Sequence, residues 1–179
     1  ISDREAVFQD QRLKNTNFEA VINLAARAGV RASLLNPWIF FETNLTGTLN
    51  LLEFARQNHI RKFIQASTST VYGLNAPTPT PESADTNHPT QSYAASKKAA
   101  EVLCYSYHDL YDVDVSILRY FTVYGPAGRP DMSMFRFARW LIEEEPLQLF
   151  GDGTQSRGFT YLDDIARGTI AALKPLGYE

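Results

Sequence analysis

A tyrosine and a lysine, Tyr93 and Lys97, stand at positions i and i+4 of the segment SYAASKKAAE (residues 92–101). The segment is rich in good helix formers, and these positions share one face of a helix, so the phenol and the ammonium are predicted to be neighbours. A nearby ammonium lowers the pKa of a phenol from its ordinary value of about 10. Such a pair could move protons near neutral pH. The alternative is an ordinary surface helix, because this spacing alone is a weak signal.

Hydroxyl groups are predicted to gather near the same helix. Two apolar runs, residues 62–67 and 114–120, are typical of buried β-strands, and each leads into hydroxyl-bearing residues, at 67–70 and at Thr122. Ligands of an open parallel sheet bind at the carboxyl ends of its strands. The helix with the tyrosine and the lysine begins after the first of these strands. We therefore expect these polar groups on one rim of the sheet.

Alternating strands and helices must position this rim. A third apolar run, residues 20–25, predicts another strand, and apolar residues recur at helical spacing over 39–54 and 92–111. This alternation predicts βαβ units and therefore an α/β fold with a parallel sheet. The Pro-rich loop at 75–91 is expected to border the site. Further expectations are a capping box that opens a first helix at Ser2–Glu5, helices over 135–144 and 163–173, and short strands at 147–150 and 159–161.

Composition narrows the class of protein. The 179 residues are 44% hydrophobic with a formal charge of −3, which is typical of a soluble globular domain and gives no reason to expect nucleic acid or a membrane as partner. One cysteine, Cys104, excludes a disulfide within the chain and fits a reducing compartment, so a cytoplasmic location is predicted. The three histidines lack cysteines or carboxylates at ligand spacing, so no metal site is expected.

Several segments, in order along nearly the whole chain, resemble the extended short-chain dehydrogenase/reductase family, and within it the nucleotide-sugar epimerases. They are VINLAA (21–26), NLTGT (44–48), ASTSTVYG (66–73), the Tyr93–Lys97 pair, RYFTVYGP (119–126) and RGFTYLDD (157–164). Within that family, AGVR (28–31), FTVYGP (121–126) and GRPDM (128–132) most resemble the UDP-glucuronate 4-epimerase branch.

The resemblance implies a partial Rossmann-type fold. Residues 1–122 would form a doubly wound parallel sheet that lacks its first βαβ portion, 123–160 part of a small substrate-binding domain, and 161–179 a helix that returns to the first domain. The family's Gly-x-x-Gly-x-x-Gly phosphate loop does not occur in this sequence. The chain is therefore expected to be an internal piece of such an enzyme, with little or no activity alone, and its first strand is expected to be an exposed sheet edge.

The resemblance also implies a reaction. NAD would take a hydride from C4 of a UDP-sugar and return it to the opposite face, through a transient 4-keto sugar. Tyr93 would be the base for the 4-hydroxyl, and Lys97 would bind the nicotinamide ribose and lower the tyrosine pKa. Thr68 would align the reacting oxygen, and Ser67 is the weaker candidate for that role. The neighbouring Lys98 is expected to be solvated.

The implied binding residues form two sets. The first would contact NAD and consists of Leu24, Ala25, Ala26, Asn44, Tyr93, Lys97 and Tyr120. The second would contact the UDP-sugar and consists of Ser69, Thr70, Thr122, Arg129, Arg136 and Arg157. Arg31 is a further candidate for the site. For the residues of both sets that are not catalytic, ordinary packing or surface exposure is the alternative interpretation.

Two other functions remain open at this stage. The missing glycine loop allows a non-catalytic remnant or a fragment that needs a partner. A nucleotide-sugar dehydratase or decarboxylase is disfavoured, because those relatives carry acidic residues in the segment that here ends at Thr70, which cannot ionise. By resemblance, a homodimer would form through the helices near 38–58 and 92–111. The aromatic residues Trp38, Phe40 and Phe41 are expected in the core or in this interface.

Overall fold

The protein folds into two compact units. The computed structural model describes residues 1–149, 151–154 and 156–178. The first unit comprises Ile1–Arg119 together with Ala171–Glu179, and the second comprises Tyr120–Ile170. Each unit is described by itself below.

A three-stranded sheet forms the centre of the first unit. Its strands are β1 (Ala20–Asn23), β2 (Lys62–Thr68) and β3 (Asp114–Tyr120), in the order β1-β2-β3. β1 and β2 run parallel. Every residue of β2 is buried, as a central strand covered on both faces requires. β1 is an edge strand of this sheet, and its Ile22 is exposed. The predicted α/β class with parallel strands is confirmed.

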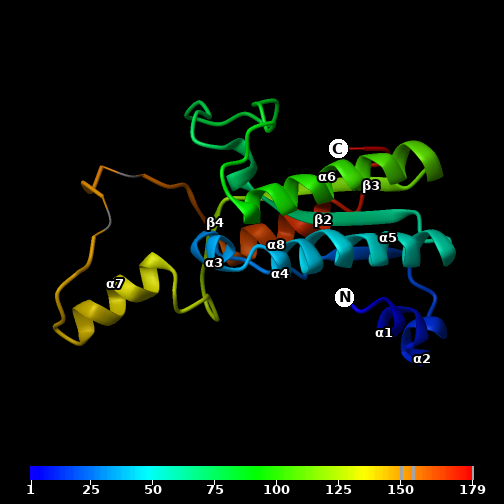
Figure 1. Cartoon of the computed structure of the whole chain (residues 1–179), viewed down its shortest axis with the longest axis horizontal. Helices are drawn as coiled ribbons and strands as arrows, with labels where there is room; N and C mark the ends of the chain where they lie inside the picture. The colour runs from blue at the N-terminus through cyan, green and yellow to red at the C-terminus, as the bar shows by residue number, and fades with distance from the viewer. Residues whose placement is uncertain (150, 155, 179) are drawn as a thin grey trace. The chain divides into compact units, whose positions relative to one another are not determined.

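Helices connect these strands and cover them. They are α1 (Arg4–Gln9), α2 (Gln11–Lys14), α3 (Val30–Leu35), α4 (Trp38–Phe41), a π-helical turn η1 (Glu42–Thr46), α5 (Gly47–Gln57), a 3-10 turn η2 (Ser69–Tyr72) and α6 (Ser92–Tyr111). Figure 1 shows α5 and α6 side by side along β2. Their buried faces meet the sheet in one apolar core, which includes Leu52, Phe63, Cys104 and Val115.

The second unit contains a smaller sheet. Strands β4 (Thr122–Tyr124) and β5 (Phe159–Tyr161) pair in parallel, with helices α7 (Ser133–Ile142) and α8 (Leu162–Ala171). Gly125 follows β4 with φ of 143°, and a β-carbon there would lie 2.9 Å from the β-carbon of Leu162. Only glycine suits both this backbone conformation and this close approach.

Several local predictions were wrong in detail. The first helix is capped by Asp3, whose carboxylate accepts from the amide of Ala6, and not by Ser2. The helix expected over 39–54 is interrupted by the π turn, because an extra residue widens one turn without disturbing the apolar spacing on either side. Helix α3 and strand β4 were not predicted. Residues 147–149 form no strand, and Phe150 lies outside the described residues.

Neither a membrane-spanning helix nor a metal-binding cluster occurs in the described residues. No helix there is long and apolar enough to cross a membrane. Within the same residues, no group of three or more His, Cys, Asp or Glu side chains could hold a metal ion.

Candidate functional site

The lysine of the Tyr93–Lys97 pair is buried against the end of strand β2. Helix α6 begins at Ser92, so both residues lie in its first two turns. Lys97 is 3% exposed, and its Nζ donates to the carbonyl oxygen of Ala66 at 2.7 Å. Tyr93 is partly buried, and its ring meets Phe40 edge-on with 6.2 Å between ring centres. The ammonium is therefore held at the end of β2, one turn along the helix from the phenol.

Burial also changes the acidity of Lys97. Loss of solvation lowers the pKa of its ammonium to about 8, and the nearby Cys104 and Glu101 oppose this shift only in part. A lysine with this pKa is still mostly protonated at pH 7, and it becomes neutral in mildly alkaline solution.

The predicted hydroxyl cluster forms the turn η2 at the carboxyl end of β2. Thr68 ends the strand, and its Oγ1 accepts from the amide of Thr70 at 3.2 Å and lies 3.0 Å from the Thr70 hydroxyl. Ser67 instead donates to Glu101, with an oxygen–oxygen distance of 2.5 Å. Because consecutive side chains of a strand point to opposite faces, only one of Ser67 and Thr68 can join the hydroxyl turn, and it is Thr68.

The buried amide of Asn44 connects the loop after β1 to helix α6. Its Oδ1 accepts from the Arg27 amide at 2.8 Å, and its Nδ2 donates to the Arg27 carbonyl and to the Ser96 hydroxyl, both at 3.0 Å. Asn44 lies in the π turn, which is a common location for functional residues. Its side chain orders the loop at 24–29 and touches the helix of Tyr93.

A second amide network supports the start of the same loop. Asn23 accepts from the Ala25 amide at 3.2 Å and donates to Gln65 at 2.9 Å and to Thr48 at 3.1 Å. The next residue, Leu24, is 60% exposed. The loop therefore presents small and apolar residues to solvent on a backbone that buried amides hold in place.

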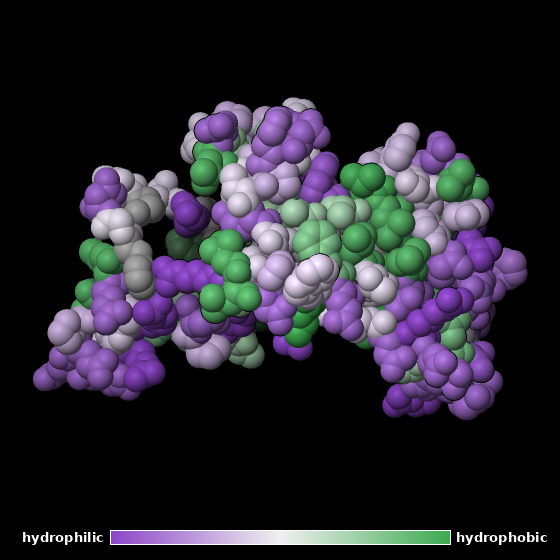
Figure 2. Space-filling model, viewed as in Figure 1, coloured by the Kyte–Doolittle hydropathy of each residue, from purple (hydrophilic) through white to green (hydrophobic). Residues whose placement is uncertain are grey.

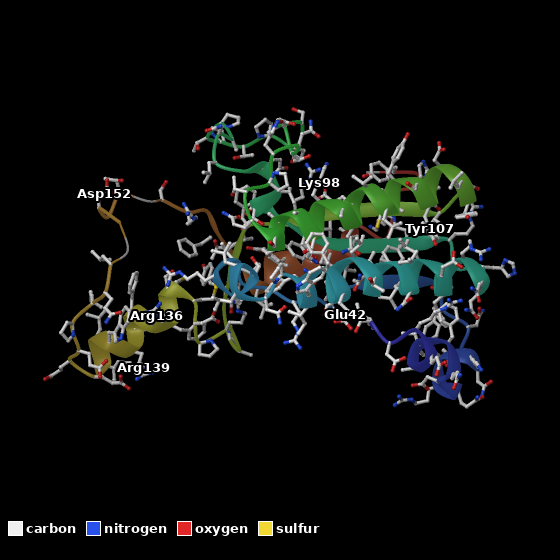
Figure 3. All side chains as sticks on the ribbon, in the orientation of Figure 1. Glu42, Lys98, Tyr107, Arg136, Arg139 and Asp152 are labelled. Carbon is white, nitrogen blue, oxygen red and sulfur yellow. The ribbon has the colours of Figure 1, made fainter. Side chains whose placement is uncertain are left out.

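Two further candidates of the first unit are Ser69, which is partly buried at the start of η2, and Arg31, which is exposed on α3. The other predicted site residues belong to the second unit. Tyr120 shares a 2.6 Å hydrogen bond with Thr169. Thr122 is partly buried in β4. Arg129 pairs with Asp131, Arg136 stacks on Trp140 with 4.6 Å to the ring centre, and Arg157 donates to the Ser156 carbonyl at 2.7 Å. Figure 3 labels Arg136 on α7.

Sequence reasoning missed a buried ion pair beside the first-unit site. Glu101 is 1% exposed and accepts two hydrogen bonds from Arg119, at 2.9 and 3.0 Å. The expectation for the next lysine was wrong: Lys98, labelled in Figure 3, is partly buried and donates to Thr86 at 2.6 Å. Helix spacing indicates the burial of Glu101, which follows Lys97 at i+4 and shares its buried face, but it does not indicate the partner Arg119.

Known epimerases are similar to this chain in sequence and in fold. The chain is 61% identical over 163 residues to a UDP-glucuronate 4-epimerase from Thermodesulfobacterium geofontis (strain OPF15), covering 91% of the chain and 50% of the relative. A solved UDP-glucuronic acid 4-epimerase from Bacillus cereus, in complex with UDP-glucuronic acid and NAD, superposes with a TM-score of 0.82 at 39% identity. That match covers 98% of this chain and 55% of the other.

A dehydratase has a similar fold. The dTDP-glucose 4,6-dehydratase DesIV from Streptomyces venezuelae, solved with NAD and TYD bound, superposes with a TM-score of 0.87 at 31% identity, over 98% of this chain and 54% of that one. The chain spans about half the length of the curated relatives that it matches. The family model described as the NAD dependent epimerase/dehydratase family matches residues 2–176, almost the whole sequence. This chain therefore belongs to the NAD dependent epimerase/dehydratase family.

Proposed function

We propose that the protein carrying this chain is an NAD-dependent 4-epimerase that converts UDP-glucuronate to UDP-galacturonate. One observation carries the proposal: Lys97 donates to the β2 carbonyl two residues before Thr68, so the Tyr93 helix and the hydroxyl turn meet at the carboxyl end of one strand. The identity to the Thermodesulfobacterium enzyme supports the choice of sugar.

In this proposal Tyr93 is the general base and Lys97 assists it. As the hydride leaves C4, the 4-hydroxyl must lose its proton, and the phenolate of Tyr93 accepts it. The Lys97 ammonium would favour that phenolate and would hold the nicotinamide ribose. Thr68 hydrogen-bonds the reacting oxygen and aligns it with the tyrosine. The ketone that forms can then be reduced on its other face.

The cofactor site is only partly contained in this chain. NAD, when bound, supplies hydride acceptance and return. The residues fit its nicotinamide end, because a buried ammonium stands beside an exposed loop of small and apolar residues that amide bonds hold in place. We assign cofactor contacts to Leu24, Ala25, Ala26, Asn44, Tyr93, Lys97 and Tyr120, with Asn44 acting through the loop that it orders. The glycine loop for the pyrophosphate is not among these 179 residues.

We assign contacts with the sugar nucleotide to the residues that the family resemblance indicates. Ser69, Thr70 and Thr122 would bind the uronate carboxylate through their hydroxyls, which would hinder loss of carbon dioxide from the 4-keto form. Arg129, Arg136 and Arg157 are candidates for the pyrophosphate, because a planar guanidinium suits phosphate oxygens. We also retain the division into a cofactor domain over 1–122, a substrate region over 123–160 and a returning helix over 161–179.

A homodimer is the proposed assembly. Helices α4–α5 and α6 each expose an apolar stripe, and Figure 2 shows apolar residues gathered over α5 and α6. Trp38, 82% exposed, is in the first stripe with Phe41, Leu45 and Leu49, and the second contains Ala95, Ala99 and Val102. Packing these helices against a second copy would remove the stripes from water. The cytoplasmic location remains a prediction from composition.

Product analysis tests the function. The full-length protein is incubated with NAD and UDP-glucuronate, and the nucleotide sugars are separated by chromatography. We expect UDP-galacturonate. UDP-xylose would overturn the proposal in favour of a decarboxylase. No turnover, together with no NAD binding by calorimetry, would favour the non-catalytic remnant. For the 179-residue chain alone we expect little activity and weak NAD binding.

A further inference from the structure

An ion pair between the partly exposed Arg119 and the buried Glu101 joins strand β3 to helix α6. The Nε of Arg119 lies 3.0 Å from Glu101 Oε1, and its Nη2 lies 2.9 Å from Oε2. Both carboxylate oxygens are therefore engaged by one guanidinium, in the two-point geometry that is the strongest for such pairs. These hydrogen bonds raise the pKa of Arg119 further, so its guanidinium stays charged.

The pair also reaches the hydroxyl turn from two sides. Glu101 accepts from Ser67, the residue before Thr68, at 2.5 Å. Arg119 Nη1 donates to the hydroxyl of Tyr72, the last residue of η2, at 3.2 Å. The centre of the guanidinium lies 5.1 Å from the centre of the Tyr72 ring, within cation–π range. Both ends of the turn are thus tied to one ion pair.

The loop at 75–91 is anchored to the same cluster. Arg119 Nη1 donates to the Glu82 carbonyl at 3.1 Å. Lys98, whose ammonium lies 3.7 Å from Glu101, donates to the buried Thr86 at 2.6 Å. Two cationic side chains, Arg119 and Lys98, therefore hold this loop, which has no regular secondary structure.

Stability alone does not account for such a cluster. Removing two charges from water costs about as much free energy as their attraction returns, and apolar side chains of similar volume often stabilise a protein equally well. The guanidinium of Arg119 binds both oxygens of Glu101 and also donates to the Tyr72 hydroxyl and the Glu82 carbonyl. Few other arrangements satisfy all these hydrogen bonds, so the cluster fixes the relative positions of the elements that it joins. The elements that it fixes carry Tyr93, Thr68 and Thr70.

We propose that Arg119 and Glu101 are positioning residues, which hold the hydroxyl turn in register with Tyr93 and Lys97. Neither residue needs to touch the substrate in this role. The inference rests on the proposed epimerase function, because that function defines the geometry that must be held. A misplacement of about 1 Å at a reacting centre is enough to lower turnover severely.

The test is Arg119→Lys in the full-length protein. Lysine keeps the positive charge but lacks the fork, so it can pair with Glu101 but cannot also hold Tyr72 and the Glu82 carbonyl. We expect kcat for UDP-glucuronate to fall about tenfold or more, while KM changes less than about threefold. A kcat within twofold of the unchanged protein would overturn the inference.

A second Arg–Glu–Tyr cluster provides a matched control. Arg56 donates twice to Glu53, both bonds at 2.9 Å, and Tyr107 donates to the same carboxylate at 2.7 Å. This cluster joins α5 to the second half of α6. We expect Arg56→Lys to leave kcat unchanged. A purely structural role for Arg119 predicts instead that both variants lower thermal stability and that neither changes kcat per folded molecule.

Amide hydrogen exchange supplies a readout that needs no turnover. The amide of Thr70 bonds to Thr68, and that of Gly73 bonds to the Thr70 carbonyl. Both amides should exchange faster in Arg119→Lys than in the unchanged protein, and at the same rate in Arg56→Lys as in the unchanged protein. If neither variant changes the exchange rates, the inference is overturned. Absence of turnover by the unchanged protein would contradict only the proposed function. If Arg119→Lys does not fold, Tyr72→Phe removes one arm of the cluster and should still accelerate exchange at Gly73.

Discussion

The two halves of helix α6 bury opposite kinds of side chain. Besides Ala94 and Ala100, the first half buries the polar Ser96, Lys97 and Glu101, whereas the second half buries Cys104 and Tyr107 among apolar residues. In the first half every buried polar group has a named partner, such as the Ala66 carbonyl for Lys97. In the second half burial raises the pKa of the Cys104 thiol to about 12, so it remains neutral. Figure 3 labels Lys98 and Tyr107 on these two halves.

This difference separates the residues to which we assign a role in catalysis from those that stabilise the fold. Apolar burial contributes free energy in proportion to the area removed from water and needs no exact orientation. Buried charges contribute little net free energy, but their hydrogen bonds define orientation. Substitution of Tyr93 in the first half should therefore change turnover more than stability, and substitutions in the core beneath the second half should do the reverse.

The largest expected effect comes from Tyr93→Phe. Loss of the phenol removes the proposed base, and general acid–base catalysis contributes about 10²–10⁴-fold, so kcat should fall by about a thousandfold. Phenylalanine keeps the ring that meets Phe40 edge-on, so the midpoint of thermal unfolding should hardly change. Steady-state kinetics and a thermal melt of the same preparation measure both quantities. Retained turnover would remove Tyr93 from the mechanism.

The opposite behaviour is expected for Phe63→Ala. Phe63 is fully buried in the core beneath α5 and α6. Truncating a buried phenylalanine typically lowers the free energy of unfolding by about 4 kcal/mol, because the lost contacts leave a cavity. Urea unfolding measures that loss, and kcat per folded molecule at low temperature should stay unchanged. Phe63→Leu, which fills most of the cavity, is the control and should cost about 1 kcal/mol. A large fall in kcat for either variant would contradict the division of α6 into one half that affects turnover and one half that affects stability.

The sequence predicted the elements better than the connections between them. Helix α6 and strand β3 have the predicted bounds, Ser92–Tyr111 and Asp114–Tyr120, because helix formers and an apolar run specify them locally. The π turn at Glu42–Thr46 was not predicted, since one extra residue leaves the apolar spacing nearly intact. Local patterns predict that a helix forms, but they do not predict where its hydrogen bonding changes from the α to the π pattern.

The candidate site shows the same division. Tyr93, Lys97 and Thr68 could be named from their motifs and their order along the chain. The Glu101–Arg119 pair could not, because its partners are 18 residues apart and each charge alone is typical of a solvated surface. Lys98 was predicted to be solvated for the same reason, and its contact with Thr86 depends on how the 75–91 loop folds back. Contacts that form when a loop folds back depend on the tertiary structure, so no local sequence pattern predicts them.

The smallest expected effect is the loss of stability caused by burying the Lys97 ammonium. It can be measured from the pH dependence of the free energy of unfolding. The Lys97 pKa of about 8 in the folded protein lies below the ordinary value of about 10.4 in an unfolded chain, so between these values the unfolded state binds more protons. Stability then rises with pH, and from pH 7 to 9.5 this one group should add about 2 kcal/mol to the free energy of unfolding. Lys97→Met, which has no such group, should lack that increment when urea unfolding is compared at the two pH values. Lys14→Gln, at an exposed position of α2, should show the same pH dependence as the unchanged protein. Parallel pH profiles for Lys97→Met and the unchanged protein would mean that the ammonium is solvated, and the contrast between the two halves of α6 would lose its electrostatic basis.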